Sequence, residues 1–240
     1  MAKPLKIRLT DGPDLSDELV LELWALRRRY VSLARTESED EAYFRKFVSA
    51  DDSIVASFHG SDGKLGGFFT IAQRPVDHAG RRGILLYSKY FYFDKAYRGH
   101  YKTLIAPWLI LPRVFRRHGL RHLYFVTTAF PQSYVSLARS TGNVRALHDA
   151  KTTPWERQAL HEFAGHYFGR DWQFERGVVI NQNVADSESL ARSEEAQALT
   201  ANFERLNPQW RQGQSLPIIF PVDWTTISHS IKRTLRRAAR

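Results

Sequence analysis

The segment from Asp94 to Thr103, DKAYRGHYKT, carries the residue types and spacing from which chemistry can be argued. It places Arg98 and Gly99 directly before a largely apolar stretch that reads as a helix. The first main-chain N–H groups of a helix have no partner within the helix, and with the helix dipole they favour a negative group. The segment therefore predicts a site for a phosphate or pyrophosphate. The alternative is an ordinary turn in which a glycine precedes a helix.

This segment resembles the motif V-D-P-x-Y-R-G-x-G-x-G of the general N-acetyltransferase (GNAT) superfamily. It matches that motif at Asp94, Tyr97, Arg98 and Gly99. Two small residues of the motif are replaced by Tyr101 and Thr103, and a tyrosine is not an obvious substitute for a glycine that permits close backbone approach. The resemblance implies that the co-substrate is bound by six consecutive residues: Arg98, Gly99, His100, Tyr101, Lys102 and Thr103.

A second landmark of the family resembles N-x-x-A-x-x-L-Y-x-x-x-G-F and falls on the stretch that ends at Gly142. Leu137 and Gly142 match it, whereas Ala138 replaces a tyrosine that in many members lies near the thioester sulfur and acts as the acid. Tyr134 stands one helical turn earlier, roughly on the same face, and is our candidate for that acid. The alternative is an ordinary half-buried tyrosine.

The resemblance implies an acyltransferase that moves an acyl group from a thioester to a small-molecule amine or hydroxyl. The donor would be acyl-CoA or a phosphopantetheine thioester on an acyl carrier protein, with no metal ion. In the family, main-chain N–H groups of the central strand bind the developing oxyanion. The strand expected at 84–93 contains no Glu, Asp or His, so the candidate bases lie outside it: His59, Asp77, His78, Asp94 and His100. Asp94 and His100 join Tyr134 as the candidate catalytic residues.

Aromatic residues around this region would line a channel for a longer acyl chain or, as we favour, pack the core: Phe68, Phe69, Tyr90, Tyr92, Trp108 and Tyr124. The stretch HEFAGH at 161–166 resembles a zinc-binding helix but has the wrong spacing. Its two histidines are five residues apart and diverge by about 140° at roughly 100° per residue, whereas the zinc motif needs them four apart on one face. We expect no metal site there.

The elements that would position these residues run as strand, two helices, three strands, helix, strand and helix. The expected helices cover about 14–34, a segment after Ser38 with Glu41 as its capping partner, 101–118 and 132–141. The expected strands cover 5–9, 53–60, 65–72, 84–93 and 122–128, with a loop at 75–83. Beyond residue 150 we expect helices at 154–168, 188–206 and 226–239 and strands at 175–182 and 218–220. Pro107 and Pro112 predict that the third helix is kinked or split.

This order predicts an α/β fold in which a GNAT-like mixed sheet is flanked by helices. We expect residues 1–150 to form the acyltransferase core and residues 151–240 to pack on the same domain as a C-terminal helical and strand extension. The absence of cysteine excludes disulfides and thiolate chemistry and fits a reducing compartment. With no apolar N-terminal leader and no apolar run long enough to span a bilayer, a cytoplasmic protein is expected.

A net charge of +10 and a pI near 9.9 favour anionic partners. An acidic carrier protein is one such partner, and nucleic acid is less favoured because no zinc-knuckle or RNP-type signature accompanies the charge. The basic amphipathic stretch Thr226–Arg240 would lie on an anionic membrane or, because its apolar stripe is narrow, remain a solvated helix. Two other function classes therefore stay open: a noncatalytic GNAT-fold binding domain, and a basic nucleic-acid or membrane-surface module.

Overall fold

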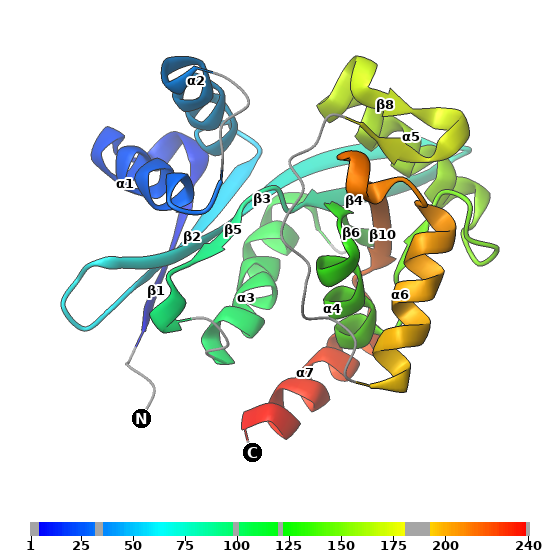
Figure 1. Ribbon diagram of the computed structural model, residues 1–240. Coiled ribbons are helices and arrows are strands. Elements are labelled where there is room, and N and C mark those ends of the chain that lie inside the picture. The colour runs from blue at the N-terminus through cyan, green and yellow to red at the C-terminus, as the bar shows by residue number, and fades with distance from the viewer. Residues whose placement is uncertain (1–4, 32–35, 98–100, 120–121, 181–192, 239–240) are drawn as a thin grey trace. The chain divides into compact units, whose positions relative to one another are not determined.

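The computed structural model describes residues 5–31, 36–97, 101–119, 122–180 and 193–238, and its main sheet has eight strands in this part of the chain (Figure 1). The strands of that sheet are β1 (Lys6–Asp11), β2 (Ser53–His59), β3 (Leu65–His78), β4 (Arg81–Tyr87), β5 (Phe91–Phe93), β6 (His122–Ala129), β7 (Arg145–Ala146) and β10 (Leu216–Pro221). Their order is β1-β2-β3-β4-β6-β10-β7, and β5 pairs with β3 off this path. A separate pair consists of β8 (Trp172–Gln173) and β9 (Val178–Val179). The predicted α/β class, a mixed sheet flanked by helices, is confirmed.

The chain divides by its internal contacts into two compact units. The first contains residues 1–74 and 86–121, and the second contains residues 75–85 and 122–239. The strands β3 and β4 contribute residues to both units. A core at 1–150 with an extension at 151–240 stays a prediction.

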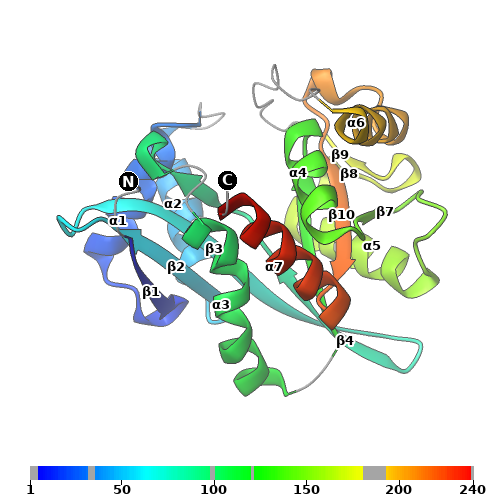
Figure 2. The same cartoon turned by 90° about the horizontal axis from the view of Figure 1, so that it is seen from below.

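In the first unit, α1 (Asp17–Arg28) and α2 (Glu37–Val48) lie on one face of the strands and α3 (Tyr101–His118) lies on the other (Figures 1 and 2). The Ser16 hydroxyl caps α1 by accepting a hydrogen bond from the Leu19 N–H. The cap of α2 is Thr36 with Glu39, two residues before the expected pair, because both hydrogen bonds of a capping box form there. The core under these two helices consists of Val20, Leu23, Leu26, Phe44, Val48, Val55, Phe68 and Tyr90.

Two expectations for the middle of the chain were wrong. The loop predicted at 75–83 is a hairpin, because β3 and β4 continue to a two-residue turn in which Ala79 and Gly80 both have positive φ. Pro75 is tolerated in β3 because the pairing of β3 with β2 already ends at Ala72, so its missing N–H lies beyond that ladder. The helix α3 is one continuous element, so the split expected at its prolines does not occur, whereas a kink there stays a prediction.

The second unit contains α4 (Pro131–Thr141), α5 (Pro154–Phe168), α6 (Glu194–Leu206) and α7 (Trp224–Ala238). The predicted bounds of α5 are confirmed, and Gly142, with φ 71°, ends α4 as expected. Within 175–182 the described strand is only Val178–Val179, and α6 begins at Glu194 rather than 188; residues 181–192 lie outside the described part. The core of this unit consists of Ala129, Tyr134, Val135, Ala146, Val178, Ala196, Phe203, Leu206, Trp210, Leu216 and Ile218.

Candidate functional site

The long strand predicted over 84–93 is interrupted at residues 88–90, which separate β4 from β5. Among the described residues β5 pairs with β3 alone, with Phe91 opposite Phe69 and Phe93 opposite Gly67. The strand β4 lies between β3 and β6 in the sheet order. The central strand thus has two neighbours before the interruption and one after it. A strand that leaves its neighbour is the place where the GNAT resemblance predicts the oxyanion donor.

The interruption is held by Thr70 of β3. The Thr70 N–H donates to the Tyr90 main-chain oxygen at 2.9 Å, and the Tyr90 N–H donates to the Thr70 hydroxyl at 3.2 Å. A side-chain oxygen therefore accepts the bond that a strand carbonyl would otherwise accept. Thr70 is fully buried, so its hydroxyl is fixed by the packing around it. The course of the backbone at the interruption depends on this one side chain.

A tight turn leads from β5 towards α3. The Asp94 N–H donates to the Gly66 oxygen at 2.9 Å, and the Asp94 carboxylate accepts from the Ala96 N–H at 3.1 Å. The ring of Tyr97 covers Gly66 so closely that a Cβ there would lie 2.6 Å from a ring carbon. Arg29 pairs with the Asp94 carboxylate at 3.6 Å. Asp94 thus has its hydrogen-bonding capacity engaged in shaping the turn, and its catalytic role stays a prediction.

The first half of the predicted phosphate site lies outside the described residues. Arg98, Gly99 and His100 lie outside the described part of the chain. Tyr101, Lys102 and Thr103 form the backbone of the first turn of α3. Main-chain N–H groups in the first turn of a helix lack intrahelical acceptors and favour anions. The helix begins at the residue expected from the sequence, and binding of a phosphate there stays a prediction.

A buried ion pair joins α1 to α2 beside the interrupted strand. Arg27 and Asp40 make two hydrogen bonds, one of them 3.0 Å between Nη2 and Oδ1, and both residues are less than a tenth exposed. The Trp24 indole N–H also donates to Asp40, at 3.0 Å. Burial acts to raise the pKa of Asp40, but the hydrogen bonds from Arg27 and Trp24 outweigh it and hold that pKa below its usual value. Asp40 is therefore a buried carboxylate that stays charged.

The phenols of Tyr90 and Tyr92 stay neutral next to this ion pair. Burial raises the pKa of both well above the ordinary tyrosine value, although the positive charge of Arg27 opposes the shift. The guanidinium of Arg27 lies 5.4 Å from the centre of the Tyr90 ring. The Tyr90 hydroxyl is buried and has no hydrogen-bond partner among the described residues. It is thus a hydrogen-bond donor at the end of the strand interruption that no described group uses.

Lys89, inside the interruption, has its ammonium group among aromatic rings. Its Nζ donates to the Tyr43 hydroxyl at 2.5 Å and lies 4.0 Å from the Tyr43 ring centre and 4.7 Å from that of Phe47. Aromatic rings attract a cation in such a place. The first unit therefore holds a primary amine among aromatic rings at the strand interruption.

These residues were not predicted as site residues, although the sequence carries a signal for two of them. Arg27 follows Leu23 by four residues on the buried face of α1, and Asp40 precedes Phe44 by four on the buried face of α2. A charged residue at an apolar-face position requires a partner, because an unpaired buried charge is costly. Two buried charges of opposite sign on consecutive helices are therefore expected to form an ion pair with each other. The position of Lys89 depends on the strand interruption, which local sequence does not indicate.

The structure places Tyr134 in the core of the second unit, where it is 2% exposed. Its hydroxyl accepts a hydrogen bond from the Asn202 side chain at 2.7 Å, and its ring packs against Phe203. Burial raises the pKa of Tyr134, and the bond from Asn202 opposes the shift only partly. These contacts correspond to the alternative of a packed tyrosine; the acid role stays a prediction.

The remaining candidates have local partners. His59 contacts the Ser57 hydroxyl at 3.0 Å through Nε2, and Asp77 pairs with Arg82 at 2.9 Å. His161 is within hydrogen-bond distance of the Trp172 indole N–H, at 3.1 Å, and among the described residues no three His, Cys, Asp or Glu side chains converge as a metal site. Of the aromatic residues proposed for a channel, Phe68 and Phe69 are fully buried, which corresponds to core packing.

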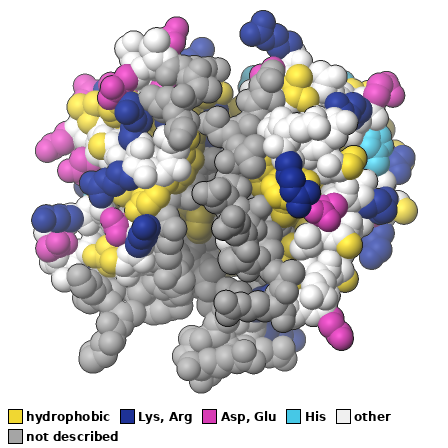
Figure 3. All heavy atoms as spheres, viewed as in Figure 1, with side chains coloured by type: hydrophobic (Ala, Val, Ile, Leu, Met, Phe, Trp, Pro, Cys, Tyr) yellow, Lys and Arg dark blue, Asp and Glu magenta, His cyan; other side chains and the backbone are white. Residues whose placement is uncertain are grey.

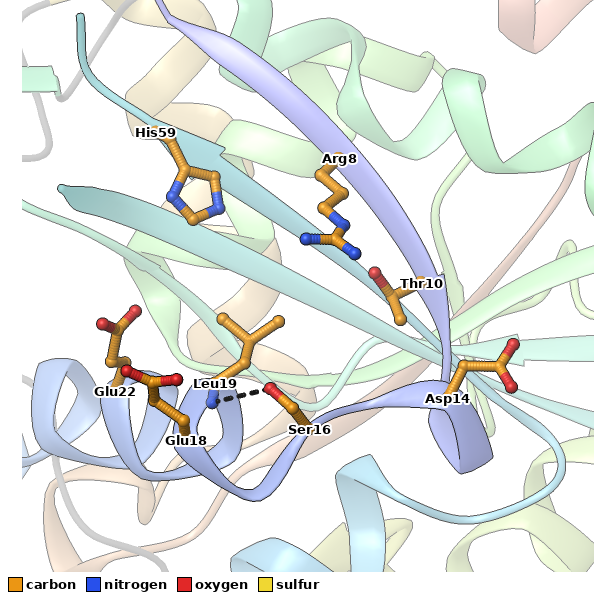
Figure 4. A pocket seen from close by; sticks show the side chains of 8 residues that line it. All are labelled: Arg8, Thr10, Asp14, Ser16, Glu18, Leu19, Glu22 and His59. Atoms are coloured by element: carbon orange, nitrogen blue, oxygen red, sulfur yellow. Dashed lines mark hydrogen bonds between the residues drawn. The ribbon is translucent and has the colours of Figure 1, made fainter. Parts of the chain in front are cut away.

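A cavity of about 290 Å³ lies between β1 and the start of α1 in the first unit (Figure 4). Its lining consists of Arg8, Thr10, Asp14, Ser16, Glu18, Leu19, Glu22 and His59. Arg8 comes from β1, and Glu18 and Glu22 are one turn apart on α1 (Figure 4). Sequence patterns gave no indication of it, because its residues are separated by up to fifty positions and meet only through the pairing of β1 with β2.

No protein-family model matches the chain, and no curated protein matches its sequence. Solved structures that align with it include a ribosomal-protein-alanine N-acetyltransferase of Brucella melitensis, with 17% identity over 54% of this chain and 85% of that one and a TM-score of 0.40. An acetyltransferase of Trypanosoma brucei aligns with 15% identity over 62% of this chain and 98% of the other, with a TM-score of 0.42.

A third structure is an acyl-CoA N-acyltransferase of Pseudomonas aeruginosa, with 18% identity, coverage of 55% of this chain and 86% of that one, and a TM-score of 0.39. By their names, these three proteins are two acetyltransferases and one N-acyltransferase. With TM-scores below 0.5 this likeness decides nothing about activity. A function has to be argued from the geometry of the chain itself.

Proposed function

We propose that the chain is an acyltransferase that moves an acyl group from the thioester of acyl-CoA, or of an acyl carrier protein, to an amine or hydroxyl. The observation that carries the proposal is the interruption of the central strand at residues 88–90. Within the same unit the chain then makes the Asp94–Tyr97 turn and starts α3 at Tyr101. Main-chain donors for an oxyanion and for a phosphate thus follow one another along one continuous segment.

In this proposal the residues from Arg98 to Thr103 bind the phosphates of the donor. As the GNAT resemblance implies, main-chain N–H groups of the central strand bind the thioester carbonyl oxygen, where negative charge develops in the transition state; the Tyr90 N–H, which donates to Thr70, is not one of them. The acceptor nitrogen attacks the carbonyl carbon, the C–S bond breaks, and the proton lost by the amine is carried to the departing thiolate. Tyr134, Asp94 and His100 are the proposed proton carriers.

The acceptor is proposed to be a small molecule with a free amine or hydroxyl. The ammonium group of Lys89 lies in aromatic surroundings at the strand interruption and indicates that a cation is tolerated there. An acyl carrier protein would suit the net charge of +10, because carrier proteins are acidic. A nucleic-acid module is less favoured, since basic and acidic side chains are interspersed on the described part of the face in Figure 3.

Thermal shift with CoA, acetyl-CoA and longer acyl-CoA, followed by release of free thiol in the presence of amines and alcohols, tests the proposal. A ligand that binds the folded state stabilises it by an amount set by its excess over the dissociation constant. Stabilisation with thiol release that depends on an acceptor is the expected result. Stabilisation without turnover would favour the noncatalytic binding domain, and no response to CoA or to a phosphopantetheine carrier would overturn the proposal. An unchanged rate in Tyr134→Phe would remove that residue from the mechanism.

A further inference from the structure

The helix α7 in the second unit exposes two of its large apolar side chains. Trp224, at its start, is 78% exposed, and Ile231, seven residues later on the same side, is 42% exposed. The buried positions of the helix are Thr226 and Ser230. A surface helix of a globular protein normally turns its apolar stripe towards the core and its polar face towards water. The described part of α7 has the opposite orientation.

Hydrogen bonds hold α7 in this orientation. The Ser230 hydroxyl donates to the Ser140 main-chain oxygen at 2.8 Å, and the Arg233 guanidinium donates to the main-chain oxygen of Arg139. Nε2 of His229 lies 3.3 Å from the same Arg139 oxygen. These oxygens belong to the last turn of α4, where carbonyl groups lack intrahelical partners. The polar face of α7 therefore caps α4, which leaves Trp224 and Ile231 exposed.

The sequence of α7 and the residues after it carries basic but no acidic side chains. From Trp224 to the end of the chain the sequence contains five basic residues and no acidic one: Lys232, Arg233, Arg236, Arg237 and Arg240. In the described part, Lys232 is exposed next to Ile231. A tryptophan with an aliphatic residue and cations on one helix is the composition that binds at the interface of an anionic bilayer.

We propose that α7 docks the protein on an anionic lipid surface. Trp224 and Ile231 enter the boundary between headgroups and acyl chains, and Lys232 contacts the negatively charged headgroups. The helix lies along the surface and does not cross it, because none of the helices in the described ranges has both the length and the apolar character of a spanning segment. This docking is independent of the acyltransferase activity.

Co-sedimentation of the full chain with vesicles tests the proposal, with phosphatidylcholine alone compared with phosphatidylcholine mixed with phosphatidylglycerol. Binding to the mixed vesicles, weakened by salt, is expected, because each basic residue near an anionic surface strengthens binding by about fivefold. The Trp224→Ala, Ile231→Ala double variant is expected to bind about tenfold more weakly or worse. The matched control is Phe174→Ala, which removes another exposed aromatic ring of the same unit and leaves binding unchanged.

Two charge-reversal variants and one fluorescence measurement complete the test. Lys232→Glu should weaken binding by about twentyfold, because it changes the charge by two, whereas Lys151→Glu, on an exposed residue of the same unit, should not. Trp224→Phe should keep binding but lose the fluorescence quenching caused by brominated acyl chains. Equal losses in variants and controls would overturn the proposal. Self-association that Trp224→Ala abolishes would also overturn it, as would binding to DNA in place of vesicles, because either result would show that α7 binds a partner other than lipid.

Discussion

Arg27 and Asp40 join the two N-terminal helices through a two-point ion pair that is almost closed off from water. The pair lies beside Tyr90, the last residue of the interruption in the central strand. Each charge is the main compensation of the other, because a buried ion needs both a partner of opposite charge and hydrogen bonds. The position of α1 and α2 over the interrupted strand therefore depends on this pair.

Replacing Asp40 by alanine is expected to lower the free energy of unfolding by about 3–5 kcal/mol, because Arg27 would be left as an uncompensated buried charge. Urea unfolding followed by circular dichroism measures this. Asp17→Ala is the matched control: Asp17 pairs with Arg45 but is 89% exposed, so its loss should cost less than about 1 kcal/mol. Equal losses in the two variants would show that the buried pair has no special role.

Acid should weaken the protein through the same carboxylate. The pKa of Asp40 is lowered in the folded state by hydrogen bonds from Arg27 and Trp24, although burial opposes this. Its contribution is therefore present above the unfolded-state pKa of about 4 and is lost as the pH falls through the lower folded-state pKa. Unfolding midpoints in urea, measured from neutral pH downwards, should fall less steeply below about pH 4 in Asp40→Asn than in the wild type. Parallel curves would contradict the assignment.

Two buried tyrosines should respond in opposite ways to removal of the hydroxyl. The Tyr90 hydroxyl has no hydrogen-bond partner among the described residues, so Tyr90→Phe should leave stability unchanged or raise it by about 1 kcal/mol. The Tyr134 hydroxyl accepts a bond from Asn202, and Tyr134→Phe should cost about 1 kcal/mol. Thermal unfolding of the two variants, compared with the wild type, measures the two changes in stability. A loss in Tyr90→Phe would mean that its hydroxyl has a partner.

Helices with clear start and stop signals were predictable from the sequence, and elements defined by distant pairing were not. Thr153 with Glu156 marks the start of α5, and Gly142 marks the end of α4, because capping is local chemistry. The two residues of β7 exist only because β10 pairs with them from more than seventy positions away. The interruption at residues 88–90 likewise depends on Thr70, about twenty residues earlier.

In the candidate site, too, local features were predictable from the sequence and distant contacts were not. The motif at Asp94–Thr103 could be read directly, because a turn before a helix has a local signature, and α3 does begin at Tyr101. Tyr134 was selected from its helical spacing. Such spacing shows on which side of a helix a residue lies, but not what that side packs against. Its partners Asn202 and Phe203 come from α6, which the sequence does not link to α4. Spacing on one helix therefore could not distinguish a site residue from a core residue.

Thr70→Val should separate a role in acyl transfer from a role in stability. The substitution keeps the shape of the side chain but removes the hydroxyl that accepts from the Tyr90 N–H, so about 1–3 kcal/mol of stability should be lost. Because the backbone at the strand interruption would shift, the turnover rate should fall by roughly tenfold or more with little change in KM.

The matched control for Thr70→Val is Thr152→Val. The Thr152 hydroxyl is also buried and donates to the Ala146 oxygen at 2.6 Å, but it belongs to the second unit, away from residues 88–90 in the sequence. Its loss should cost comparable stability and leave turnover unchanged when both variants are compared well below their melting temperatures. If the two variants lose activity alike, the rate reflects general loosening of the fold. In that case the interrupted strand can no longer be regarded as the oxyanion site.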